Sequence, residues 1–241
     1  MISSQDGSTT EPESGERAVS DMIAFMLVFA TIIVSVALLS TFGMQAMTEY
    51  QEGEQLQNAE RAMVSLSDNF DDVLRHDGIE QRYGELSLRE GTITTGDSGT
   101  VVTIKSTSSK IDEEVNLGEF TYQSGSDTIA YEGGGVLRSD GEGSVVLKRP
   151  SLTCREDGAA VISLIKTDSE NRSIQSSGGL GVTMTETDRT RTTYDDIDTV
   201  TVEAIDSDYD DAWDDVYNSS DEWTCNADRA VITIVTVDIE Y

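Results

Sequence analysis

An uninterrupted apolar segment near the start of the chain most constrains its fold. Residues 22–42 read MIAFMLVFATIIVSVALLSTF and contain no charged side chain. At about 1.5 Å per residue, a helix of this length spans roughly 30 Å, the thickness of the hydrocarbon core of a bilayer. The preceding residues are mostly polar and acidic, unlike the basic start of a cleaved secretory signal. The segment therefore favours a membrane anchor over such a signal.

The basic residues around this segment predict its orientation. Arg17 precedes it, and the next basic residue along the chain is Arg61. Positive charges next to a membrane span stay on the cytoplasmic side. We therefore expect the N-terminus in the cytoplasm and the rest of the chain outside the membrane.

The charge of the chain excludes several classes of function. Sixteen Lys and Arg residues stand against 46 Asp and Glu, which leaves a formal net charge of −30. Such a surface repels phosphate, so we expect no nucleic-acid partner and no electrostatic docking on anionic lipid. Acid-rich surfaces with only four Lys resemble those of proteins from salt-loving organisms, where salt screens the repulsion between carboxylates.

The residues just before the apolar segment resemble a known processing motif. Residues 17–23 read RAVSDMI. They resemble the class III signal peptide of haloarchaeal type IV pilins, close to RAVSPVIG before a hydrophobic helix. The chain departs from this pattern at Asp21, where Pro is usual, and at Ala24, where Gly is usual; the residues that match are Arg17, Ala18, Val19, Ser20 and Ile23.

The resemblance covers about 30 of the 241 residues and implies how the chain is processed. It implies cleavage between Ala18 and Val19 by a membrane prepilin peptidase that recognises Arg17, Ser20 and Asp21. Residues 1–18 would be the leader and 19–43 the transmembrane and filament-core helix. The implied partners are other pilin-like subunits, bound through this helix, the peptidase, and an assembly platform with its ATPase.

An amphipathic stripe predicts that the helix continues over residues 44–78. From Leu56 the apolar positions follow at intervals of 3, 4, 3, 4 and 3, namely Leu56, Ala59, Met63, Leu66, Phe70 and Val73. This spacing places them on one helix face. The face can pack on a head domain or pair with a second helix in a coiled coil.

The remaining residues, 79–241, have the pattern of a β-rich head. Short apolar runs alternate with turns rich in Gly, Ser and Asp. Residues 231–241 alternate well and predict a long strand in the middle of a sheet, and 209–218 predict a short helix. The expected fold class is α+β, a long helix that carries a mostly antiparallel head, either a bent sheet or a sandwich.

Two Cys and two sequons give candidate modifications of the head. Cys154 and Cys225 both follow the membrane segment, so a disulfide is permitted; two buried free thiols are the alternative. Asn171 and Asn218 each begin an Asn-x-Ser sequon. The resemblance to pilin-like surface proteins implies that such sites are glycosylated.

No residue pattern indicates catalysis, a cofactor or a metal. Ser163 and Lys166 match S-x-x-K, but on a strand these positions point to opposite faces. The acidic stretch from Asp206 lacks the Gly and Glu that a calcium loop needs at its sixth and twelfth positions. His76 lies near the expected helix end, where a positive charge complements the helix dipole.

The sequence thus predicts a non-enzymatic structural subunit. We expect a minor subunit of an archaeal type IV pilus-like surface filament or envelope complex, with a role in adhesion. It would be a single-pass membrane precursor before assembly and lie on the cell surface afterwards. The alternative is a membrane-anchored extracellular binding module that does not polymerise, and an anchored extracellular enzyme is a third class.

Overall fold

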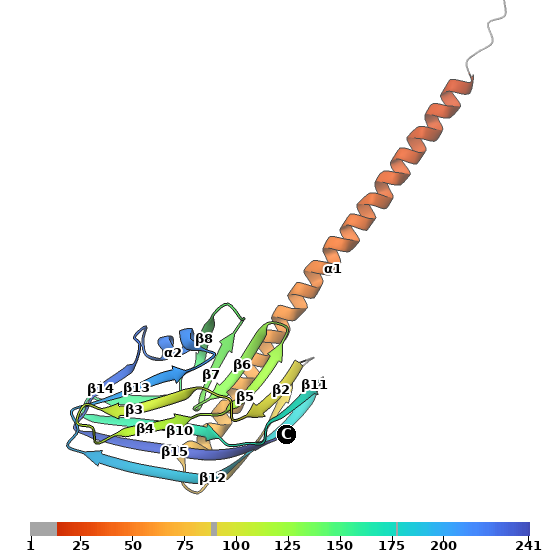
Figure 1. The fold of residues 1–241 in the computed structure, drawn as a ribbon. Coiled ribbons are helices and arrows are strands. Elements are labelled where there is room, and N and C mark those ends of the chain that lie inside the picture. Colours follow the sequence, from red (N-terminus) through yellow and green to blue (C-terminus); the bar gives the residue numbers. More distant parts are fainter. Residues whose placement is uncertain (1–13, 88–90, 177) are drawn as a thin grey trace, which may run out of the picture. The chain divides into compact units, whose positions relative to one another are not determined.

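The computed structural model describes residues 14–87, 91–176 and 178–241, which form two helices and fifteen strands (Figure 1). They divide into two compact units, Met1–Gly53 and Glu54–Tyr241. The first unit contributes only helix, and the second holds every sheet. This is the α+β class that the sequence predicts.

The long helix α1 runs over Ser14–Arg75, 62 residues. It ends three residues before the expected position 78. At that point the chain turns at Asp77 and Gly78 into the first strand, and the amide of Ile79 donates to the carbonyl oxygen of His76 at 3.1 Å. Residues 54–75 of α1 belong to the second unit, the head.

A five-stranded sheet is built around the last strand of the chain. Its order is β1 (Gln81–Ser87), β12 (Gly179–Asp195), β15 (Arg229–Glu240), β10 (Ala159–Thr167) and β9 (Ser151–Arg155). The central position of β15 confirms the prediction made for 231–241. β10 and β15 run parallel, whereas the other strand pairs of the described residues are antiparallel.

Two further antiparallel sheets complete the head. The six-stranded sheet has the order β11 (Arg172–Ser176), β2 (Gly91–Gly96), β5 (Glu119–Ser124), β6 (Asp127–Glu132), β7 (Gly135–Ser139) and β8 (Ser144–Lys148). The four-stranded sheet has the order β14 (Trp223–Asn226), β13 (Thr199–Asp206), β3 (Val101–Ser106) and β4 (Asp112–Asn116). The head is therefore neither one bent sheet nor a plain sandwich.

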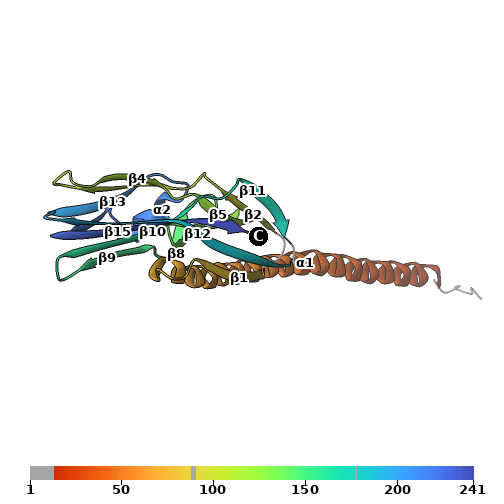
Figure 2. The ribbon, with the colours of Figure 1, turned by 90° about the horizontal axis from the view of Figure 1, so that it is seen from below.

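The two faces of β15 pack into two separate cores, because successive side chains on a strand point to opposite faces. Ala230 and Ile232 belong to a core shared with β3 and β13, and β13 lies beside β15 in Figure 2. Val235, Val237 and Ile239 belong to a second core, which contains the buried side chains of α1. The central strand thus joins the helix to the four-stranded sheet.

The short helix α2 (Asp210–Val216) lies inside the range 209–218 predicted for it. Ala212, Trp213 and Val216 are buried on one face, as expected from their spacing. The ring of Tyr217, just after the helix, lies 5.8 Å from that of Trp213. α2 is thereby held on the first core by aromatic packing.

Candidate functional site

The apolar part of α1 is the first candidate surface for function. Val19–Met44 is long and apolar enough to cross a membrane, with a mean hydropathy of 2.8, and it lies near the N-terminus. Its large side chains are exposed, for example Phe25 at 70% and Leu39 at 74%. A helix with these properties serves as a membrane anchor or as a signal sequence.

Three hydroxyl side chains within this segment are satisfied by the helix itself. The hydroxyls of Thr31, Ser35 and Thr41 donate to the carbonyl oxygens of Leu27, Thr31 and Ala37 at 2.8, 2.7 and 2.9 Å. A hydroxyl that bonds to the preceding turn needs no water. These three residues therefore carry little penalty when the helix lies in lipid or against another apolar helix.

The residues of the expected processing motif lie near the beginning of α1. Val19, Ser20 and Asp21 are helical and exposed. Arg17 and Ala18 are helical by their backbone, but their side chains, and residues 1–13 of the expected leader, lie outside the described residues. The expected scissile bond, between Ala18 and Val19, thus lies in helical backbone close to a helix end, where unwinding is easiest.

The amphipathic stripe of α1 is buried in the head. Ala59, Met63, Leu66, Phe70 and Val73 are each less than 5% exposed and belong to the second core. This burial confirms the expected packing on a head domain. The same face is therefore not available for a coiled coil with a second helix.

Close packing fixes the helix against the strands beside it. The rings of Phe70 and Tyr131 meet edge to face, with centroids 5.7 Å apart. On β1, a Cβ at Gly84 would lie 2.3 Å from Cδ1 of Leu66, so any other residue there would require the buried Leu66 side chain to move.

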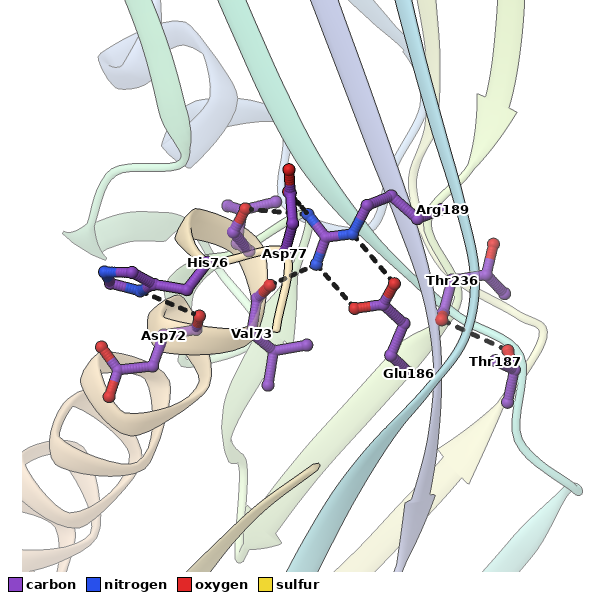
Figure 3. Close-up of polar contacts among 9 residues, drawn as sticks. Asp72, Val73, His76, Asp77, Glu186, Thr187, Arg189 and Thr236 are labelled. Carbon is purple, nitrogen blue, oxygen red and sulfur yellow. Dashed lines mark hydrogen bonds and ion pairs between the residues drawn. The ribbon is translucent and has the colours of Figure 1, made fainter. Parts of the chain in front are cut away.

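One arginine closes the C-terminal end of α1 (Figure 3). Arg189, on β12, donates from Nη2 to the carbonyl oxygen of Val73 and from Nη1 to that of Leu74 at 3.3 Å. The last carbonyl groups of a helix have no partner within it, and the helix dipole favours a cation there. Glu186 holds the guanidinium in place through two hydrogen bonds, of 2.9 and 2.6 Å.

Ion pairs attach the same part of α1 to other strands. Lys148, on β8, lies 2.9 Å from Asp68 and 3.1 Å from Asp71, and donates to the Ser67 hydroxyl at 2.8 Å. Arg138, on β7, lies 2.9 Å from Glu60. Charged groups thus hold the head part of the helix at Glu60, Asp68 and Asp71 as well as at its end.

A disulfide joins two sheets at their edges. Cys154 of β9 and Cys225 of β14 form a bond of 2.03 Å, with their Cα atoms 5.5 Å apart. β9 is an edge strand of the five-stranded sheet and β14 an edge strand of the four-stranded sheet. The disulfide predicted from the sequence is confirmed, and the alternative of two free thiols is wrong.

Comparison with known proteins places the chain in a family. A family model described as "Family of unknown function (DUF7289)" matches residues 17–240. The chain belongs to DUF7289. The match begins at Arg17 and covers both the apolar helix and the whole head, so DUF7289 is defined by the two together. No curated protein and no solved structure matches the chain.

Two carboxyl groups are buried in the described part of the head of this DUF7289 protein, namely Asp71, which pairs with Arg75 and Lys148, and Glu132. Glu132, at the end of β6, is 2% exposed, and Thr100 donates its hydroxyl proton to it at 2.5 Å. Since that proton is used, Trp213 and Ser207 donate to the Thr100 oxygen, at 3.2 and 2.7 Å. Burial, together with the nearby charges of Glu119 and Asp208, raises the pKa of Glu132 to about 7 against the lowering effect of the hydrogen bonds with Thr100.

The surroundings of Glu132 are acidic. It lines a pocket of about 260 Å³ together with Asp97, Glu119 and Asp208, and no Lys, Arg or His lines this pocket. Among the described residues of the DUF7289 chain, no group of three or more His, Cys, Asp or Glu is placed to hold a metal ion. The arrangement provides a group that binds and releases a proton near neutral pH.

The other candidate residues are placed as follows. Ser163 and Lys166 lie on β10, and the acidic stretch from Asp206 forms the end of β13 and the helix α2. His76 follows α1 directly, and its Nδ1 lies 3.3 Å from the carbonyl oxygen of Asp72, at the helix end as expected (Figure 3). Asn171 and Asn218 are exposed.

The sequence pattern does not predict the roles of Glu132 and Arg189. Glu132 follows an apolar strand and precedes three glycines, and a charge in that position is a weak signal of a buried polar group. Arg189 lies among Thr and charged residues that carry no apolar alternation. Its role depends on the register of β12 against β15, which no local pattern encodes.

Proposed function

We propose that this protein is a pilin-like subunit of a surface filament or envelope complex in a salt-loving archaeon. The observation that carries the proposal is the composition of α1. One helix holds an exposed, mostly apolar span of 26 residues and, farther along, a stripe that is buried in the head. Such a helix can lie in a membrane and later pack against copies of itself, because both surroundings cover apolar side chains.

The anchoring of the helix in the head supports this role. A subunit held in an assembly by its helix must carry load from that helix to its head. Arg189 at the helix end, Lys148 at Asp71 and Arg138 at Glu60 connect the head part of α1 to three different strands. A passive membrane anchor needs no such set of connections.

Processing and location form the second part of the proposal. A prepilin peptidase recognises Arg17, Ser20 and Asp21 and cleaves between Ala18 and Val19. The helix then enters the assembly with the help of a platform protein and an ATPase. The head lies outside the cell, where the Cys154–Cys225 disulfide is stable and the acidic surface faces brine.

The identity of the mature N-terminus tests the proposal. The full chain is expressed in a salt-loving archaeal host with and without its prepilin peptidase, and the terminal peptide is sequenced by mass spectrometry. We expect a terminus at Val19 that is absent without the peptidase. Arg17→Ala prevents cleavage, whereas Arg61→Ala, an exposed arginine of α1 outside the motif, leaves it unchanged. An intact leader in both strains contradicts the proposal.

A second candidate is an anchored binding module that does not polymerise. It is favoured by an open cleft of about 750 Å³ in the head, lined by Tyr217, Trp223 and several carboxylates. Filaments recovered from the cell surface that contain the protein would exclude this candidate. A processed or unprocessed protein that stays in the membrane fraction as single copies would favour it.

A further inference from the structure

The cleft beside the second sequon has the features of a modification site. It is lined by Asn218 itself, by the aromatic side chains of Tyr217 and Trp223, and by Ser220, the third residue of the sequon. The residues come from the turn after α2 and from the start of β14, and all belong to the head. The acceptor amide and a cleft of about 750 Å³ are thus adjacent.

The Asn218 side chain is oriented for modification. Arg149 donates from Nη1 to Oδ1 of Asn218 at 3.2 Å and to the carbonyl oxygen of Val216 at 3.0 Å. Arginine can only donate, so it must face the amide oxygen, and the amide nitrogen is turned away from it. That nitrogen is the atom to which an N-linked sugar is attached.

The backbone around the two sequons differs. Asn218 and Ser219 have φ values of 61° and 62°, and Ser220 follows them in an unpaired turn. In the other sequon, Ser173 lies within β11, in register with Thr94 of β2. A transferase must surround all three residues of a sequon, so the turn at Asn218 is open to it and the paired strand after Asn171 is not.

The lining of the cleft suits a sugar. Tyr217 and Trp223 contribute aromatic side chains to it, and both residues are largely buried. Glu203 and Glu222 accept hydrogen bonds from sugar hydroxyls, and Trp223 offers an apolar edge to a sugar ring.

We propose that Asn218 carries an N-linked glycan whose first, neutral sugars lie in this cleft. A neutral sugar is favoured because the lining holds carboxylates and no Lys or Arg. In the transfer, the Asn218 amide nitrogen loses a proton and bonds to C1 of the sugar, and the bond from C1 to the phosphate of a lipid-linked donor breaks. The inference rests on the proposed function, because the head must reach the compartment of the transferase.

Glycopeptide mass spectrometry tests the attachment. The full chain is purified from an archaeal host whose own surface protein is confirmed to be glycosylated. We expect a glycan on the peptide that contains Asn218, absent in Asn218→Gln and in Ser220→Ala, which leaves Asn218 and Arg149 unchanged. Asn171→Gln is the matched control and keeps the glycan. An unmodified Asn218 in the wild-type protein overturns the inference.

Hydrogen exchange tests the place of the sugars. In the glycosylated protein we expect amide exchange of residues 220–224 to be several-fold slower than in Ser220→Ala, with no difference around Asn171. A glycan on Asn218 without this protection overturns its placement in the cleft. A protein with its terminus at Val19 but no glycan contradicts the inference alone, whereas a glycan on an unprocessed chain contradicts the pilin pathway alone.

Discussion

Arg189 donates a hydrogen bond to the carbonyl oxygen of Val73, so a side chain from β12 closes the last turn of α1. The two residues are 116 positions apart in the chain. The guanidinium is only 15% exposed and is held from the other side by Glu186. The end of the helix and the second strand of the five-stranded sheet therefore form or break as one unit.

Replacing Arg189 tests this connection. We expect Arg189→Ala to lower the free energy of unfolding by about 2–4 kcal/mol, because it frees helix carbonyl groups and leaves Glu186 without its partner. Arg155→Ala is the control, since Arg155 and Asp157 form an exposed pair of 3.7 Å whose loss changes stability by about 0.5 kcal/mol or less. Urea unfolding measures both; equal effects would show that Arg189 has no special role.

Glu132 predicts a pH dependence of stability. Its pKa is about 7 in the folded chain and about 4.3 when unfolded, so the folded state holds the proton more tightly. Its contribution to stability is complete below pH 4 and is lost as the pH rises through 7, by at most about 4 kcal/mol. We expect the urea concentration at the unfolding midpoint to decrease as the pH rises from 5.5 to 8. The decrease should be smaller in Glu132→Gln. An identical slope in the two proteins would contradict this assignment.

Removing the disulfide lowers stability through the unfolded state. The Cys154–Cys225 bond spans 71 residues, and the chain-entropy model gives a stabilisation of about 4 kcal/mol for such a loop. We expect the double variant Cys154→Ser/Cys225→Ser to unfold at lower urea than the wild type. A reductant should lower the wild-type midpoint and leave that of the variant unchanged. A reductant effect on the variant would point to another cause.

We expect the affinity of the protein for membranes to depend only on the first unit, Met1–Gly53. We expect residues 54–241 to fold, with the circular dichroism of a β-rich protein, and to stay in the soluble fraction. The full chain should appear in the membrane fraction because of Val19–Met44. A fragment that still sediments with membranes would place a second membrane contact in the head.

Salt should stabilise the head. With a net charge of −30, mutual repulsion of carboxylates opposes the compact state, and screening reduces it. We expect the thermal midpoint to rise steadily from 0.1 to about 2 M KCl, as the Debye length falls from about 10 Å to below 3 Å. A midpoint that does not change with salt would mean that the acidic groups are already compensated within the fold.

The sequence predicts what local periodicity encodes. The stripe from Leu56 to Val73 predicts a helix with one buried face, and the structure has it. The alternating residues of β15 predict a central strand in the same way. β12 was not predicted, because its residues TETDRTRTT have no apolar alternation and become a strand only by pairing with β15. The parallel pairing of β10 and β15 likewise depends on tertiary contacts.

The candidate sites also divide into those that local sequence predicts and those that depend on tertiary contacts. The Cys154–Cys225 bond was predicted from the number and position of the cysteines. The raised pKa of Glu132 was not, since it depends on burial and on Glu119 and Thr100, which lie on other segments. The cleft at Asn218 needed the fold as well, because Arg149 reaches the amide from 69 residues away.

The central position of β15 has a consequence for how the protein is made. β15 comes after every other described strand in the chain, yet both cores need its side chains. While the ribosome is still adding these residues, the nascent head has apolar surfaces that nothing yet covers. Folding of the head is therefore completed only when synthesis of β15 is finished, and a chain released too early remains a substrate for chaperones and proteases.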